Sequence, residues 1–110
     1  MITTHVLDTA AGRPGKAIAV ELERDDAGTW HRIGAGTTDD DGRLRTLTQS
    51  GSVTAGTYRI RFHTGAYFTA NGRDSFFPVV EIQFTVSDGA QHYHVPLLLS
   101  PFGYTTYRGS

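Results

Sequence analysis

Short runs of alternating apolar and polar residues recur along the whole chain, and turn residues separate them. Successive side chains of a β-strand point to opposite faces, so this alternation predicts strands that are buried on one face. In Ala17–Arg24 the apolar positions are Ile18, Val20 and Leu22, and Val79–Val86 repeats the pattern. In all, the pattern predicts about eight strands: Ile2–Asp8, Ala17–Arg24, Thr29–Thr37, Arg43–Leu47, Thr57–His63, Val79–Val86 and the two strands of a final hairpin.

Glycine-containing turns punctuate these strands at the spacing of an antiparallel sandwich. Ala10–Gly15 is expected to be a loop, and Gly65–Ala70 is expected to be one short helix. Trp30 or Ile33 is expected to anchor the third strand in the core. The pattern therefore predicts an all-β fold of about eight strands with one short helix, and it leaves the topology open.

The last nineteen residues, His92–Ser110, carry the richest side-chain chemistry of the chain. The apolar face of the predicted strand carries Tyr93, Val95, Leu97 and Leu99. His92 and His94 therefore share the opposite face. Ser100–Gly103 has the Pro and Gly positions of a type I turn, after which Tyr104–Arg108 returns as the second strand. Polar side chains are thus expected to gather near Ser110.

Composition narrows the class of protein further. The chain has 110 residues, which predicts a single domain over 1–110, and its net charge is −1 with no basic block. Nucleic acid and anionic membranes are therefore not expected as partners. Without cysteine, disulfides and thiolate catalysis are excluded. No apolar run is long enough to span a bilayer and no signal-peptide pattern opens the sequence, so we expect a cytoplasmic protein.

Two motifs near the end of the sequence resemble the C-terminal signature of one enzyme family. His94–Pro101 reads HVPLLLSP and Tyr107–Ser110 reads YRGS. Both resemble the 5-hydroxyisourate hydrolases, the transthyretin-related enzymes of purine breakdown. His5–Asp8, Asp41–Arg43 and Ser75–Pro78 resemble other landmarks of that family, so the similarity covers essentially the whole chain. It implies a transthyretin-like antiparallel β-sandwich with its helix between the fifth and sixth strands.

The resemblance also implies an activity and an assembly. Such enzymes hydrolyse 5-hydroxyisourate to 2-oxo-4-hydroxy-4-carboxy-5-ureidoimidazoline in urate degradation, by direct attack of water and without a cofactor. They are homotetramers, dimers of dimers whose active sites line a channel between subunits. The alternative is a non-catalytic, transthyretin-like binding protein for a small ligand. The hormone-carrying transthyretins share the sandwich but lack this set of histidines and the closing Tyr-Arg-Gly-Ser.

Three residues of the resemblance would carry the chemistry. His5 alone would most simply be a strand histidine with a local hydrogen bond. The resemblance makes His5 and His94 the catalytic pair, one as general base and the other as a substrate-binding group, and sequence leaves open which is the base. Arg43 would bind substrate and stabilise a developing oxyanion. Arg45 is its rival on the same strand face, and the Asp-Gly-Arg resemblance selects Arg43.

The tail completes the expected site. Termini usually fray, but the resemblance implies that this one is ordered in the active site. Tyr107 would hydrogen-bond the substrate, Ser110 would orient water, substrate or a catalytic histidine, and Arg108 would anchor the tail. His92 would shape or support the pocket.

Two clusters in the sequence have side chains that could bind a metal ion. His92 and His94 with His5 could form a three-nitrogen site, but no Asp or Glu lies beside them as a supporting partner and cysteine is absent. Asp39–Gly42 lacks the alternate carboxylates and the closing Glu of an EF-hand loop. We therefore expect no metal site, and we interpret Asp39–Gly42 as a solvated turn.

Overall fold

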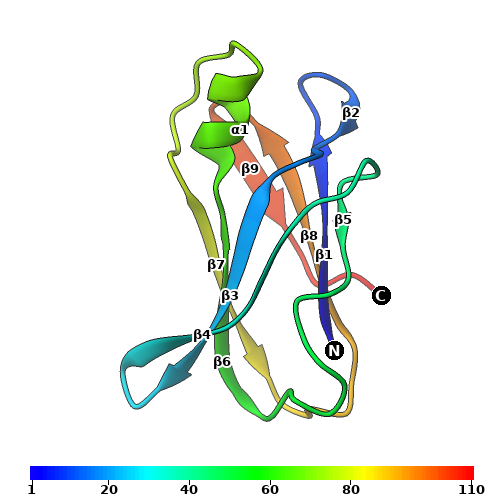
Figure 1. The fold of residues 1–110 in the computed structure, drawn as a ribbon, viewed down its shortest axis with the longest axis vertical. Coiled ribbons are helices and arrows are strands. Elements are labelled where there is room, and N and C mark those ends of the chain that lie inside the picture. Colours follow the sequence, from blue (N-terminus) through cyan, green and yellow to red (C-terminus); the bar gives the residue numbers. More distant parts are fainter.

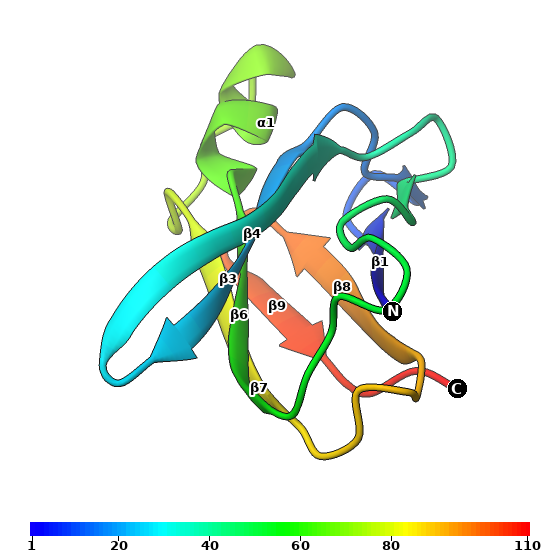
Figure 2. The same ribbon diagram turned by 60° about the horizontal axis from the view of Figure 1, so that its bottom comes forward.

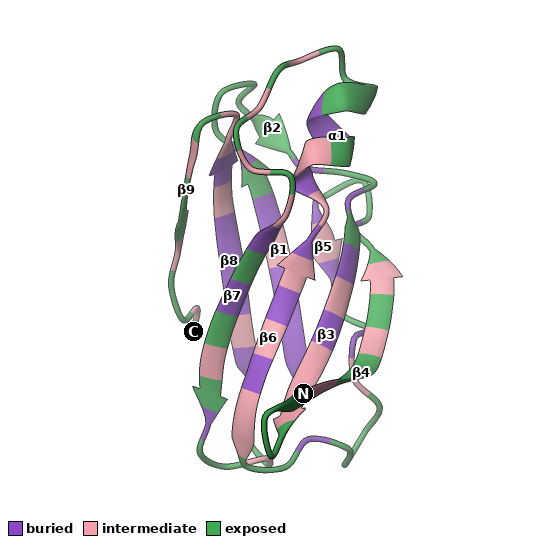
Figure 3. Cartoon of the chain, turned by 90° about the vertical axis from the view of Figure 1, so that its left-hand side faces the viewer, coloured by how far each residue is buried: buried purple, intermediate pink, exposed green.

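The computed structural model describes residues 1–110 and shows two β-sheets packed face to face (Figures 1 and 3). The first sheet has five strands in the order β2-β1-β8-β9, with β5 also paired to β1, and the second has the order β4-β3-β6-β7. The elements are β1 Ile2–Asp8, β2 Arg13–Pro14, β3 Ala19–Asp26, β4 Thr29–Thr37, β5 Arg43–Leu44, β6 Gly56–Phe62, α1 Thr64–Ala70, β7 Val80–Val86, β8 Tyr93–Ser100 and β9 Gly103–Thr106. The all-β sandwich with one short helix is confirmed. Figure 2 shows α1 at one end of the sandwich.

Most of the predicted strands are confirmed to within two residues at each end, and the larger differences lie near β2, β3 and β5. The expected loop after β1 contains the short strand β2, because a turn with Gly12 at φ 66° folds the chain back onto β1. The second predicted strand, which is β3 in the structure, starts at Ala19 and not at Ala17, which has φ 61° and is therefore outside the β region. The fourth, β5, ends at Leu44 because the chain turns to bury Leu47 in the core.

One strand pair is parallel. β1 and β8 run side by side in the same direction, with Thr3 opposite His94 and His5 opposite Pro96. Parallel neighbours need a long connection, and here the whole second sheet lies between them in sequence. Since Tyr93 and Val95 of β8 are buried in the core, His94 points to the outer face of the five-stranded sheet, where it meets Thr3 of β1.

The core lies between the sheets and follows the predicted alternation. Ile18, Val20, Leu22, Tyr58, Ile60, Phe62, Val80, Ile82, Tyr93, Val95, Leu97 and Leu99 are all buried there. The anchor predicted for β4 is wrong. Ile33 is exposed, and Trp30 is only half-buried and lies outside the core, with the Arg59 guanidinium 4.4 Å from its ring centre. β4 is an edge strand whose Gly34 and Gly36 pack tightly against Leu47 and Leu44, so β5 and the segment after it fill this space in place of a large β4 side chain.

A buried carboxylate joins β1 to the helical end of the sandwich. Asp8 has no exposed surface and accepts hydrogen bonds from Tyr67 Oη at 2.7 Å, Arg73 Nη1 at 2.6 Å and the Ala11 N–H at 2.9 Å. Burial would raise its pKa, but these donors, above all Arg73, outweigh it and lower the pKa to about 2. The far end of the strand that carries Thr3 and His5 is thereby fixed. The one helix is too short to cross a membrane.

Candidate active site

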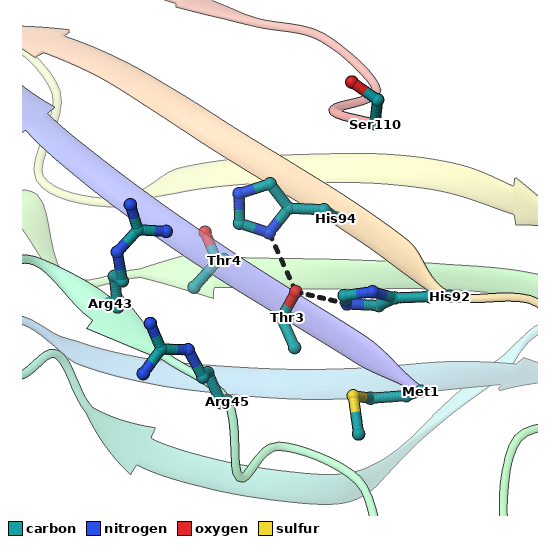
Figure 4. Close-up of a pocket in the computed structure, with 8 residues that line it drawn as sticks. All are labelled: Met1, Thr3, Thr4, Arg43, Arg45, His92, His94 and Ser110. Atoms are coloured by element: carbon teal, nitrogen blue, oxygen red, sulfur yellow. Dashed lines mark hydrogen bonds between the residues drawn. The ribbon is translucent and has the colours of Figure 1, made fainter.

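A polar pocket of about 220 Å³ lies on the outer face of the five-stranded sheet (Figure 4). It forms where β1, β5, β8 and the C-terminal tail meet. Its lining is Met1, Thr3, Thr4, Arg43, Arg45, His92, His94 and Ser110. No carboxylate side chain is among these residues, so the side-chain charge of the pocket is positive.

His94 is the best-defined imidazole in this pocket. Its Nδ1 lies 2.8 Å from Thr3 Oγ1, and the same hydroxyl lies 2.7 Å from His92 Nε2. Burial lowers the pKa of His94, and the neighbouring basic groups His92, His5, Arg43 and Arg45 lower it further. His94 is therefore neutral at pH 7, the state in which an imidazole can accept a proton.

His5 lies beside this pocket on β1, paired across the sheet with Arg43 on β5 and with Pro96 on β8. Its Nε2 is 3.0 Å from the carbonyl oxygen of Asp41. A carbonyl oxygen only accepts, so Nε2 carries the hydrogen and Nδ1 is the unprotonated nitrogen of the neutral ring. His5 thus has a fixed tautomer and a fixed position next to Arg43.

The turn before β5 holds Arg43 in place. The Asp39 carboxylate accepts hydrogen bonds from the N–H groups of Asp41 and Arg43, each at 2.9 Å. Gly42 has φ 77°, and a Cβ there would lie 2.3 Å from the Val6 carbonyl oxygen. A larger residue would therefore push the turn away from β1. The Arg43 side chain forms no hydrogen bond or ion pair with the protein, which leaves its guanidinium free for a ligand.

The C-terminal tail is ordered against His94. After β9 the chain turns back, and the Gly109 N–H donates to the His94 carbonyl at 2.7 Å. A Cβ on Gly109 would lie 2.7 Å from His94 Cδ2, so only glycine permits this approach. Arg108 donates to Gln91 Oε1 at 3.0 Å and lies 4.4 Å from the ring centre of Tyr93. These contacts bring Ser110 to the pocket.

The structure of one chain does not bring every expected residue together. Arg43, His94 and Ser110 line one pocket and His5 adjoins it, whereas Tyr107 is 55% exposed and lines another depression, between β7 and β9. The expected contact of Tyr107 with substrate stays a prediction. The sequence reasoning missed Thr3. The signal was present, because Thr3 lies two residues before His5 and therefore shares its strand face.

His5, His92 and His94 do not all converge on one point. No group of three His, Cys, Asp or Glu side chains is placed to hold a metal ion. His5 bonds to a backbone carbonyl, and His92 and His94 share the Thr3 hydroxyl. The arrangement instead combines a neutral imidazole with free guanidinium groups, which suits proton transfer next to an anionic or carbonyl-rich ligand.

The fold and the site together define a transthyretin-like sandwich with a cationic, histidine-bearing pocket on its outer face. The sequence profile of the HIUase/Transthyretin family matches residues 2–109, and the chain belongs to this family. It is 42% identical over 110 residues to the 5-hydroxyisourate hydrolase of Salmonella typhimurium, covering 100% of this chain and 81% of that protein.

Solved structures give the same family. Sea bream transthyretin in complex with thyroxine has a TM-score of 0.93 at 36% identity, covering 98% of this chain and 93% of that one. The 5-hydroxyisourate hydrolase of Klebsiella pneumoniae has a TM-score of 0.87 at 34% identity, covering 99% and 92%. The backbone thus resembles a thyroxine-bound transthyretin and a hydrolase about equally, so the fold alone does not distinguish between their functions.

Proposed function

We propose that this protein, as one domain over residues 1–110, hydrolyses 5-hydroxyisourate to 2-oxo-4-hydroxy-4-carboxy-5-ureidoimidazoline in urate degradation. The observation that carries the proposal is the neutral, half-buried His94 in a pocket whose free charged side chains are guanidinium groups. An anionic purine-derived ring matches these donors. The pocket is smaller than the roughly 300–1,000 Å³ of typical ligand sites, which suits a small ring compound.

His94 is the general base of this mechanism. Its Nδ1 is engaged by Thr3, so Nε2 is the nitrogen available to the pocket. It takes a proton from water as the water oxygen attacks C6 of the substrate, and the N1–C6 amide bond then breaks. A positioned base of this kind contributes roughly 10²–10⁴-fold in rate. His5, beside Arg43, binds the ring.

Arg43 stabilises the charge that develops on the carbonyl oxygen during attack. Its guanidinium has no protein partner to release before it binds the oxyanion, and the Asp39 turn holds its backbone. A donor aimed at an oxyanion is commonly worth about 10²–10³ in kcat. Ser110 orients the attacking water or the substrate from the ordered tail.

The test is a coupled assay. Urate oxidase generates 5-hydroxyisourate from urate, and its decay is followed by absorbance with and without the protein. We expect fast decay with the wild type, a loss of about 10²–10⁴-fold for His94→Ala, and a loss of about 10²–10³-fold for Arg43→Ala. The matched control is His31→Ala, which removes an exposed histidine of β4 on the other sheet.

A carrier function is the competing interpretation, because sea bream transthyretin, solved in complex with thyroxine, has a similar backbone. Decay at the spontaneous rate in the presence of folded wild-type protein would refute the hydrolase function and leave a binding protein of the same fold as the alternative.

The assembly we propose is a homotetramer, a dimer of dimers. β7 and β9 are the edge strands at one side of the sandwich, each paired on one side only (Figure 3). Unpaired strand edges favour pairing with a second copy, and exposed Tyr104 and Tyr107 lie at this side. Light scattering should give four times the 12.0 kDa mass of the chain; a monomeric mass would exclude this assembly. The cysteine-free chain suits the cytoplasmic location we propose.

A further inference from the structure

The hydroxyl group of Thr3 is shared by two histidines. Thr3 is 3% exposed, and its Oγ1 lies 2.7 Å from His92 Nε2 and 2.8 Å from His94 Nδ1 (Figure 4). A hydroxyl group has one hydrogen to donate. When all three groups are neutral and both contacts are hydrogen bonds, Thr3 therefore donates to one histidine and accepts from the other.

Two arrangements of the hydrogens satisfy this rule, and they give His94 opposite roles in proton transfer. In the first, Thr3 donates to His92 and accepts from His94 Nδ1, so His94 Nε2 has a free lone pair and is a base. In the second, Thr3 donates to His94 Nδ1, so Nε2 carries the hydrogen and is an acid. Hydrolysis of an amide needs both: a base for the attacking water and an acid for the departing nitrogen.

We propose that Thr3 and His92 form a proton relay that converts His94 from base to acid during the reaction. The relay rests on the hydrolase function proposed above. Thr3 and His92 act through His94 and are positioning residues.

The proton transfers balance at each step. His94 Nε2 takes the proton of the attacking water, the Nδ1 proton passes to Thr3 Oγ1, and the Thr3 hydroxyl proton passes to His92 Nε2. His92 is exposed and releases its Nδ1 proton to solvent. When the C6–N1 bond breaks, the sequence reverses: N1 receives the Nε2 proton of His94, and His92 recovers a proton from solvent.

The charges around the pocket supply the reason for a relay. Arg43 and Arg45 line the pocket together with His94 and form no ion pair with the protein. A lasting positive charge on His94 would be repelled by both guanidinium groups. The relay moves that charge to the exposed ring of His92, where water screens it.

The experiment compares Thr3→Val, which keeps the shape and removes the hydroxyl, with Thr3→Ser, which keeps the hydroxyl. Both are checked for folding by thermal unfolding and assayed for 5-hydroxyisourate decay. We expect Thr3→Ser to stay within about threefold of wild-type kcat and Thr3→Val to lose roughly tenfold or more in kcat with little change in KM. Equal losses in both variants, or wild-type kcat in Thr3→Val, would overturn the relay.

His92→Ala provides an independent readout. Because His92 is exposed, imidazole added to the buffer can reach the vacated space. We expect a lowered kcat that added imidazole restores in part, while His31→Ala keeps wild-type kcat and does not respond to imidazole. Loss of activity without rescue would assign His92 a structural role only and overturn the relay. An inactive wild type would instead refute the hydrolase function itself, so the two failures are distinguishable.

Discussion

Replacing Asp8 with asparagine tests whether the buried carboxylate fixes β1. Asp8 is fully buried and bonded to Arg73 and Tyr67, and its pKa is lowered from the usual 3.8 to about 2. A group whose pKa is lower in the folded state than in the unfolded state stabilises the fold at pH values above its unfolded-state pKa. This stabilisation disappears as the pH falls through the folded-state pKa. Asp8 should therefore stabilise the fold fully above about pH 5 and lose this contribution toward pH 2.

The size of this contribution follows from the shift. At 1.36 kcal/mol per pKa unit, a change from 3.8 to about 2 corresponds to about 2–3 kcal/mol at neutral pH. By the same linkage relation, about half of this stabilisation remains at pH 3. Asp8→Asn cannot ionise, so it should be less stable than wild type by about 2–3 kcal/mol at pH 7 and by about half as much at pH 3.

Urea unfolding at pH 7, 5, 4 and 3, at one protein concentration, measures this difference. Glu21 also has a pKa lowered to about 2, by hydrogen bonds from His63 and Arg32, but it titrates in both proteins and cancels in the comparison. Asp74→Asn, an exposed carboxylate next to Arg73, is the matched control and should change stability little at any pH. A difference between wild type and Asp8→Asn that stays constant from pH 7 to pH 3 would refute the reasoning.

Three further changes probe the tail, a turn and the core. Gly109→Ala places a Cβ 2.7 Å from His94 Cδ2. In the coupled assay we therefore expect at least a roughly tenfold loss of kcat, with little change in thermal stability. Wild-type activity would mean that the tail need not touch His94. Ala27 has φ 52° before Gly28 in the β3–β4 turn. Ala27→Asn creates the Asn-Gly pair that such turns favour, so the free energy of unfolding measured with urea should rise by up to about 1 kcal/mol. Tyr58→Phe leaves the N–H and C=O of Thr54 without their shared partner. We expect the free energy of unfolding, measured in the same way, to fall by about 1–3 kcal/mol. No loss would show that water replaces the hydroxyl.

The sequence by itself determined the strands, their inward faces and most of the site chemistry. A period of two residues is a local property of extended backbone, so the alternation in Ala17–Arg24 and in the final hairpin was sufficient to assign the inner face of each strand. The placement of His92 and His94 on one side of the chain followed from the same rule. The resemblance carried by the two C-terminal motifs supplied the topology and the expected roles of His5, Arg43 and Ser110.

Only the tertiary structure decided how these faces meet. The parallel register of β1 and β8 places Thr3 against His94, 91 positions apart in sequence. No local pattern encodes a pairing across that separation, because register between distant strands depends on how the whole core packs. Tertiary packing also decides the environment of β4, whose Gly34 packs against Leu47. It likewise decides the position of Tyr107, which lies at the free edge of the sandwich because the chain leaves β9 and turns back toward His94.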